Sequence, residues 1–269
     1  MAMSSAPQRR RFLVACGESQ IEAFVVGDGD STLILAAGNG RPGAQLDRLA
    51  SDLAADGIRC VTFNYRGIGD SSGPHEGITL HDYANDMLAI ADHLGVWQVH
   101  LAGKTFGNRV VRAAAHRVPE RVASTTLIGA GGKILPSAET QALYRRLLDP
   151  SISPAEWSAL NTELNYAPVN AHCAASALDL GMYPEVSAAQ IAASDATPPE
   201  EWMPGGRGPM LVIVGLDDRV AVPANGFEIA TTRPHTTLIG LADCGHNMVD
   251  EQPERLRRAI AAFVHEHST

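Results

Sequence analysis

The segment LAGKTFGNRV, residues 101–110, decides the fold of this 269-residue chain. It begins with apolar residues typical of a buried strand, passes through Gly103 and Gly107, and continues into a sequence compatible with a helix. Thr105 lies at the apex of the turn between the two elements. Such a glycine pair can mean close packing alone, so the rest of the sequence must decide between packing and chemistry.

One chemical interpretation of this turn is phosphate binding. Gly103-Lys104-Thr105 matches the end of G-x-x-x-x-G-K-[ST], a loop whose backbone amides wrap nucleotide phosphates. The first glycine of that motif would fall on Gln98, and residues 99–102 resemble a strand where the motif needs a flexible loop. Nucleotide binding is therefore disfavoured.

The second interpretation is a nucleophile elbow, G-x-S-x-G, which joins a strand to a helix through a very tight turn. Glycines two residues before and two residues after the apex let the chain pack closely enough to hold the apical residue strained and exposed. Gly103 and Gly107 occupy these positions, with Thr105 in place of serine.

Composition excludes several classes of protein. With 45% apolar and 19% charged residues, the chain can bury a large core as one domain or as a domain with an insertion. A net charge of −9 without a basic cluster beyond residues 9–11 argues against nucleic acid as a partner. No apolar stretch approaches the roughly 20 residues of a membrane span. The four cysteines are scattered, which favours reduced thiols and a cytoplasmic protein.

Short apolar or β-branched runs alternate with helical patterns along most of the chain. This alternation predicts a mostly parallel sheet covered by helices on both faces, with the first two strands paired as an antiparallel edge. The predicted strands are 12–15, 21–26, 32–37, 60–65, 99–102, 125–128, 210–214 and 236–241. Helical periodicity marks two sets of residues: Tyr83, Met87, Ile90, Ala91 and Leu94, and, after Pro253, Leu256, Ile260, Phe263 and Val264.

The alternation stops between residues 133 and 208, where many prolines interrupt helical segments. We expect helices over 138–148, 154–164, 171–180 and 187–193, and no strand. The sequence therefore predicts a helical cap, residues 133–208, inserted into a core made of residues 1–132 and 209–269.

Two further strand ends carry polar residues suited to catalysis. LVIVGLDDRVAVP, residues 211–223, is a buried strand followed by Asp218, and CGHNMVDEQPERL, residues 244–256, places His246 in the loop before the last helix. Either residue alone would be more typical of a turn or a surface. Thr105, Asp218 and His246 nevertheless follow the chain order of a nucleophile, an acid and a base.

With these residues the sequence resembles the α/β-hydrolase family over most of its length, from about Ile21 to Val264. The matching stretches are LILAAGNG (33–40), FNYRGIGDSSG (63–73), the elbow, PERV (119–122), GLDDRVAVP (215–223) and GHNMVDEQPE (245–254). The resemblance implies an α/β-hydrolase fold: an eight-stranded, mostly parallel sheet flanked by helices, with a cap inserted after the sixth strand.

The resemblance also implies site roles. Thr105 corresponds to the nucleophile, His246 to the general base and Asp218 to the carboxylate that orients the imidazole, with the adjacent Asp217 a weaker alternative. The backbone amides of Asn39 and Phe106 correspond to the oxyanion hole. We predict substrate contacts from Gly38, Lys104, Trp157, Tyr144 and Met182. For Lys104 the alternative is a structural hydrogen bond, and for the cap residues it is packing inside the cap.

Three positions depart from the family pattern. Ala37-Gly38 replaces the usual His-Gly of the oxyanion loop, Lys104 replaces the histidine before the nucleophile, and Thr105 replaces serine. A β-branched residue with positive φ is a steric outlier, and such strain usually accompanies function. The extra methyl group crowds the base and the incoming carbonyl.

The sequence leaves the reaction open between several classes. The first is hydrolysis of a small ester, lactone, thioester or related carbonyl compound by Thr105 or by a water that His246 activates. The alternatives are a lyase, decarboxylase or cyclase that uses the His246–Asp218 pair, and a silent small-molecule binding protein. We expect no metal and no cofactor, a small-molecule substrate as the partner, no membrane association, and possible homodimers.

Overall fold

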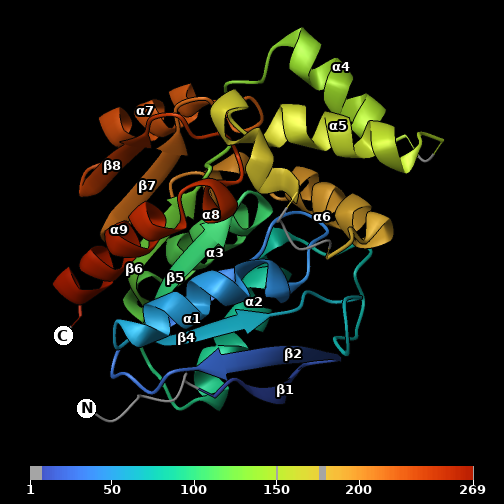
Figure 1. Ribbon diagram of the computed structural model, residues 1–269. Helices are drawn as coiled ribbons and strands as arrows, with labels where there is room; N and C mark the ends of the chain where they lie inside the picture. The colour runs from blue at the N-terminus through green and yellow to red at the C-terminus, as the bar shows by residue number, and fades with distance from the viewer. Residues whose placement is uncertain (1–7, 150, 176–179, 269) are drawn as a thin grey trace.

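The computed structural model describes residues 8–149, 151–175 and 180–268. Its strands form one eight-stranded sheet in the order β1-β2-β4-β3-β5-β6-β7-β8 (Figure 1). The strands are β1 Arg10–Cys16, β2 Ser19–Val26, β3 Thr32–Ala36, β4 Arg59–Phe63, β5 Val99–Lys104, β6 Val122–Ile128, β7 Met210–Gly215 and β8 Thr236–Leu241. Every predicted strand is present, which confirms the predicted α/β-hydrolase fold class.

Strand direction follows the predicted pattern. β1 pairs with β2 in antiparallel fashion through a turn at Gly17, where φ is 56°, and β2 is antiparallel to β4. The remaining neighbours are parallel. All residues of β3, β5 and β7 are buried, as expected for parallel strands with helices on both faces.

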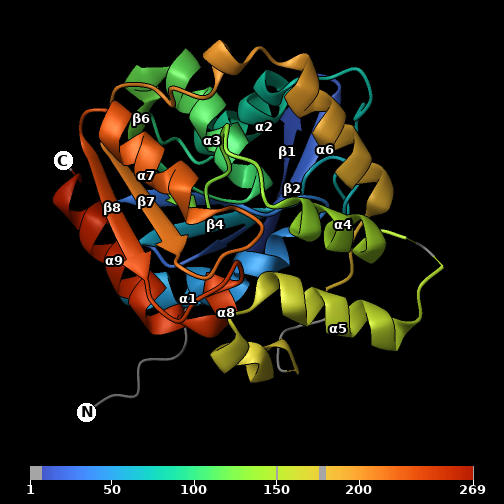
Figure 2. The same ribbon diagram turned by 90° about the horizontal axis from the view of Figure 1, so that it is seen from above.

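Helices cover both faces of the sheet (Figure 2). α1 (Asp47–Ala55) and α9 (Pro253–Glu266) lie on one face, and α2 (Leu80–His93) and α3 (Phe106–Arg117) lie on the other. Each buries one apolar side against the sheet. Two further helices, α7 (Pro223–Thr232) and α8 (Met248–Glu251), follow β7 and β8. Among the described residues, no helix is both long enough and apolar enough to cross a bilayer.

The segment between β6 and β7 contains helices and loops and no strand among its described residues. It contains α4 (Ala138–Leu147), α5 (Pro154–Asn165), a 3₁₀ helix η3 (Pro168–Ala175), α6 (Pro184–Ala196) and a 3₁₀ helix η4 (Pro199–Glu201). Serine side chains cap α4 and α5, and proline occupies the first turn of α5 and α6.

The predicted helical segment 171–180 coincides with a 3₁₀ helix, η3, over residues 171–175. The 3₁₀ helix η3 is described as far as Ala175, and residues 176–179 of the prediction lie outside the described residues. The division into a core and a cap at residues 133 and 208 stays a prediction.

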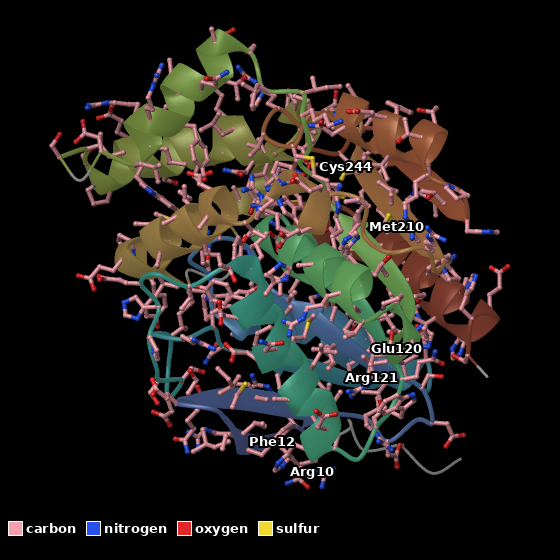
Figure 3. All side chains as sticks on the ribbon, turned by 180° about the vertical axis from the view of Figure 1, so that it is seen from behind. Arg10, Phe12, Glu120, Arg121, Met210 and Cys244 are labelled. Atoms are coloured by element: carbon pink, nitrogen blue, oxygen red, sulfur yellow. The ribbon has the colours of Figure 1, made fainter. Side chains whose placement is uncertain are left out.

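The inserted helices α4, α5 and α6 lie on the side of the sheet toward which the parallel strands run (Figure 1). In Figure 3, Cys244 lies toward this side, whereas Glu120 and Arg121, which directly precede β6, lie toward the opposite side. The loops that leave the carboxyl ends of β5, β7 and β8 therefore meet under the inserted helices.

Candidate active site

Thr105 occupies a strained position between β5 and α3. Its φ is 52° and its ψ is −106°, a conformation that costs a β-branched residue about 1–3 kcal/mol. The two flanking glycines show what holds it there. A Cβ on Gly103 would overlap the carbonyl group of Gly107, and a Cβ on Gly107 would overlap the carbonyl oxygen of Ala36. Backbone-to-backbone packing between α3 and the sheet thus fixes the apex.

The side chain of Thr105 begins a chain of hydrogen bonds. Its Oγ1 lies 2.8 Å from Nε2 of His246, and Nδ1 of the same imidazole lies 2.8 Å from Oδ2 of Asp218. The other carboxylate oxygen accepts hydrogen bonds of 2.8 Å from the amides of Val220 and Ala221. The structure therefore brings together the three residues that the sequence placed at separate strand ends.

Burial distinguishes the two neighbouring aspartates. Asp218 is 3% exposed and faces the imidazole, whereas Asp217 is exposed. Gly129 leaves room for the ring, because a Cβ there would lie 3.3 Å from Cε1 of His246. Asp218, not Asp217, is thus placed to orient the imidazole.

Asn39 and Phe106 line the same cavity as Thr105. The amides on either side of Asn39 are engaged: that of Gly38 donates to Oε1 of Gln45 at 2.9 Å, and that of Gly40 donates to Oε1 of Gln190 at 2.7 Å. Within the described part of the chain, no hydrogen bond uses the amide of Asn39 or Phe106. Both donors are therefore available to an oxyanion.

Helix α6 holds the loop that carries Asn39. The side-chain amide of Asn39 donates to the carbonyl oxygen of Ser187 at 3.3 Å and to Oε1 of Gln190 at 3.1 Å. The hydroxyl of Ser187 donates to Oδ1 of Asn39, and the amide of Tyr183 donates to the carbonyl oxygen of Gly40 at 2.9 Å. The oxyanion loop is therefore attached to the inserted segment.

The histidine loop is attached to another part of the inserted segment. The amide of Asn247 donates to the carbonyl oxygen of Asn165 at 2.9 Å. The carboxylate of Glu251 accepts hydrogen bonds from the amides of Ala167 and Gly245, each at 2.9 Å. Asn165 at the end of α5 thus contacts the histidine loop directly, and Ala167 contacts it through Glu251.

A cavity of about 470 Å³ lies next to Thr105. Tyr144 lines it, as the sequence predicts for a substrate contact. The sequence did not single out Arg109, Arg145 or Asp195, which also line it. Arg109 could have been found, because a residue four positions after the apex of an elbow lies on the same side of the helix. The remaining lining residues are Asn39, Thr105, Phe106, Gly129, Gly131, Pro136, Thr140, Gln141, Ile191, Ser194, Val220 and Ala221.

The other predicted substrate contacts lie outside this lining. Gly38 is close, since a Cβ there would lie 3.7 Å from Oγ1 of Thr105. Met182 is half-buried and approaches Gly40, and Trp157 on α5 is also half-buried. Their contact with a substrate stays a prediction.

Lys104 is buried and points away from the cavity lining into the histidine loop. Its Nζ donates to Oδ1 of Asn247 at 3.1 Å. Burial lowers the pKa of the amine to about 8, with a smaller contribution from Arg41. Of the two alternatives for this residue, the structure shows a structural hydrogen bond.

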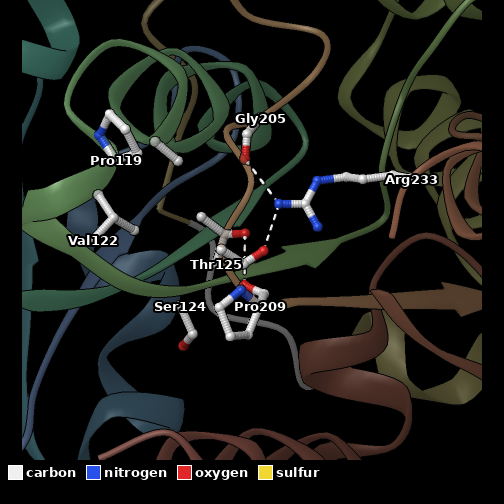
Figure 4. Close-up of a pocket in the computed structure, with 9 residues that line it drawn as sticks. Pro119, Val122, Ser124, Thr125, Gly205, Pro209 and Arg233 are labelled. Atoms are coloured by element: carbon white, nitrogen blue, oxygen red, sulfur yellow. Dashed lines mark hydrogen bonds between the residues drawn. The ribbon is translucent and has the colours of Figure 1, made fainter. Parts of the chain in front are cut away.

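A second pocket lies at the opposite edge of the sheet, near Val122, the first residue of β6 (Figure 4). The guanidinium of Arg233 donates to the carbonyl oxygens of Gly205 and Gly208 at 3.3 and 2.6 Å. The pocket holds only about 10 Å³, which is space for one water. It is not a candidate substrate site. The described residues also contain no group of three or more His, Cys, Asp or Glu side chains able to hold a metal ion.

Comparisons with known proteins agree with this architecture. A family model described as alpha/beta hydrolase fold matches residues 32–149. A 2-hydroxy-6-oxononadienedioate/2-hydroxy-6-oxononatrienedioate hydrolase from Burkholderia vietnamiensis is 26% identical over 258 residues, covering 88% of this chain and 88% of the relative.

Solved structures give the same result for the fold. The structure of Rv0554 from Mycobacterium tuberculosis matches with a TM-score of 0.80 at 23% identity, covering 97% of this chain and 100% of that one. A thermophilic esterase from Thermogutta terrifontis matches with a TM-score of 0.77 at 23% identity, with the same coverage of 97% and 100%. At this level of identity the likeness concerns the fold alone.

Proposed function

This chain belongs to the α/β-hydrolase fold family, and on that premise we propose that it hydrolyses a small ester, lactone, thioester or related carbonyl compound with Thr105 as the nucleophile. One observation carries the proposal: Oγ1 of Thr105, the imidazole of His246 and the carboxylate of Asp218 are joined by two hydrogen bonds of 2.8 Å each. A hydroxyl in this arrangement can transfer its proton to the imidazole as it attacks.

In the first half of the reaction, Oγ1 of Thr105 attacks the carbonyl carbon and its proton moves to Nε2 of His246. The amides of Asn39 and Phe106 stabilise the negative charge on the carbonyl oxygen. When the intermediate collapses, the leaving group takes the proton from His246 and the acyl group stays on Thr105. Asp218 keeps the imidazole oriented and stabilises its charged form.

In the second half, a water molecule attacks the acyl group and gives its proton to His246. The bond to Oγ1 breaks, the proton returns to Thr105, and the carboxylic acid leaves. The methyl group of Thr105 crowds both attacks, so we expect a slower reaction than a serine would support.

A second candidate is hydrolysis of a carbon–carbon bond next to a ketone. The relative from Burkholderia vietnamiensis is a hydrolase of an oxo acid, which presents a ketone carbonyl in place of an ester. The same pair of Asp218 and His246 could then activate water directly, and Thr105 would hydrogen-bond the substrate.

Incubation with p-nitrophenyl acetate distinguishes these routes. Acylation of Thr105 predicts a mass increase of one acetyl group on the peptide that contains it, and Thr105→Ala abolishes this increase. We expect Thr105→Ala and His246→Ala each to lower kcat/KM by about 10³–10⁴-fold. We expect Thr105→Ser to match or exceed the wild type, because serine has less strain and a less crowded hydroxyl.

Other outcomes contradict the covalent route. Unchanged turnover in Thr105→Ala together with loss in His246→Ala would assign the attack to water. Unchanged turnover in His246→Ala would show that Thr105, His246 and Asp218 do not catalyse the reaction. Thermal stabilisation by a ligand that gives no product would instead indicate a binding protein.

A further inference from the structure

Two arginines of α3, Arg109 and Arg112, face the ring of Trp202 but differ in their hydrogen-bond partners. The guanidinium of Arg112 lies 4.9 Å from the ring centroid of Trp202 and donates to the carbonyl oxygens of Met203 and Gly131. The guanidinium of Arg109 lies 5.4 Å from the same ring centroid. Among the described residues, Arg109 makes no hydrogen bond and no ion pair within 4 Å, and it lines the cavity next to Thr105.

This unpaired guanidinium is half-buried. Burial lowers the pKa of Arg109 and the charge of Asp195 opposes that change. Apart from the ring of Trp202, the cation has no hydrogen-bonding or ion-pair partner among the described residues. A guanidinium has five N–H donors in a rigid fork, and donors that lose water without gaining an acceptor destabilise the site. A carboxylate supplies two oxygens in the matching geometry.

The other charged residues of the cavity leave this position open to an anion. Arg145 lines the cavity from α4 and is exposed, and Asp195 is the one carboxylate among the lining residues. Asp195 forms no ion pair with Arg109 within 4 Å. The lining therefore carries two cationic side chains against one anionic side chain.

The position of Arg109 also places it in the same cavity as the reaction centre. It follows Thr105 by four residues, lies in the first turn of α3, and lines the same cavity as Thr105.

We propose that Arg109 binds a carboxylate of the substrate, so that the natural substrate is an anionic carbonyl compound whose charge lies in the same cavity as the carbon that is attacked. The reaction on this compound rests on the proposed function, whereas the binding of its carboxylate does not. Arg109 is in this role a specificity-determining residue, and it takes no part in proton transfer.

Two nearly isosteric esters test the proposal. Mono-p-nitrophenyl adipate carries a carboxylate five bonds from the ester carbonyl carbon, and p-nitrophenyl hexanoate carries a methyl group in its place. We expect the wild type to prefer the adipate ester, and Arg109→Gln to lower the ratio of the two kcat/KM values by about 10–100-fold. The matched control is Arg117→Gln, which removes one charge from the same helix at an exposed site, and its ratio should equal that of the wild type.

A binding measurement separates this inference from the proposed hydrolysis. Free adipate should raise the melting temperature of the wild type and of Arg117→Gln, and should not raise that of Arg109→Gln. If neither ester is hydrolysed, the proposed function fails. The change in melting temperature with free adipate then shows on its own whether Arg109 binds a carboxylate. Equal ester ratios in the wild type and Arg109→Gln, or equal stabilisation of both by adipate, would overturn it.

Discussion

The two halves of the candidate site are held in different ways. Thr105 and Asp218 follow β5 and β7, and their positions are fixed by the sheet and by glycine contacts of α3. Asn39 and His246 lie in loops that are hydrogen-bonded to the inserted segment, through α6 and through residues at and just after the end of α5. The nucleophile and the acid thus depend mainly on the core, with the exposed ion pairs of Arg219 to Glu139 and Glu163 as the links of the acid loop to the inserted helices. The base and the oxyanion donor also depend on hydrogen bonds to the inserted helices.

This difference suggests how a strained threonine is maintained. Backbone packing cannot relax without moving a helix away from the sheet, so it can hold a residue at a φ of 52°. Side-chain hydrogen bonds are individually weaker and can be lost without unfolding the protein. Substitutions in the core around Thr105 should therefore lower the stability of the protein more than its turnover. Substitutions in the inserted helices that contact the loops of Asn39 and His246 should lower turnover more than stability.

The largest effect is expected for Gly107→Ala. The new Cβ would overlap the carbonyl oxygen of Ala36, so α3 must move away from β3 or the protein fails to fold. We expect a loss of at least about 3 kcal/mol in the free energy of unfolding, measured by urea denaturation. The control is Gly131→Ala, because a Cβ there meets no heavy atom within 4 Å. Equal stability of the two variants would contradict the proposed origin of the strain.

The second effect concerns Lys104, a charge buried between the two halves. Its folded-state pKa is about 8, against 10.5 in the unfolded chain, so the unfolded state binds more protons between these values. Stability should therefore rise with pH through this window. Lys104→Met removes the titration. Relative to this variant, the wild type should gain about 2 kcal/mol in unfolding free energy between pH 8 and pH 10. Parallel pH profiles of the two proteins would show that the amine is not desolvated.

The sequence predicted the sheet and the elbow better than the contacts of the inserted helices. Strands, elbow glycines and the order of Thr105, Asp218 and His246 are local signals, because each depends on a few consecutive residues and on the direction of a strand. The contacts of Gln190 with Asn39 join residues about 150 positions apart and depend on how α6 packs. Helical periodicity predicts that α6 exists, but not which loop it touches. The role of Arg109 was missed for the same reason, since only the packed structure shows that its guanidinium lacks a partner.

The smallest effect is expected for Gln190→Leu, and it tests the inserted side directly. Oε1 of Gln190 accepts hydrogen bonds from the amide of Gly40 at 2.7 Å and from the side chain of Asn39 at 3.1 Å. Complete removal of an oxyanion donor typically costs 10²–10³ in kcat, so we expect looser positioning of one donor to cost about tenfold. KM should change less than kcat, because the donor acts mainly in the transition state.

The control for this variant is Glu185→Gln, an exposed substitution in the first turn of the same helix. Steady-state kinetics with p-nitrophenyl hexanoate give kcat and KM for each protein. A melting curve shows whether each protein is folded. A folded Gln190→Leu protein with wild-type kcat would show that α6 does not position the oxyanion loop. A raised KM with unchanged kcat would place Gln190 in substrate binding, because only a contact made equally in the ground state and in the transition state has that effect.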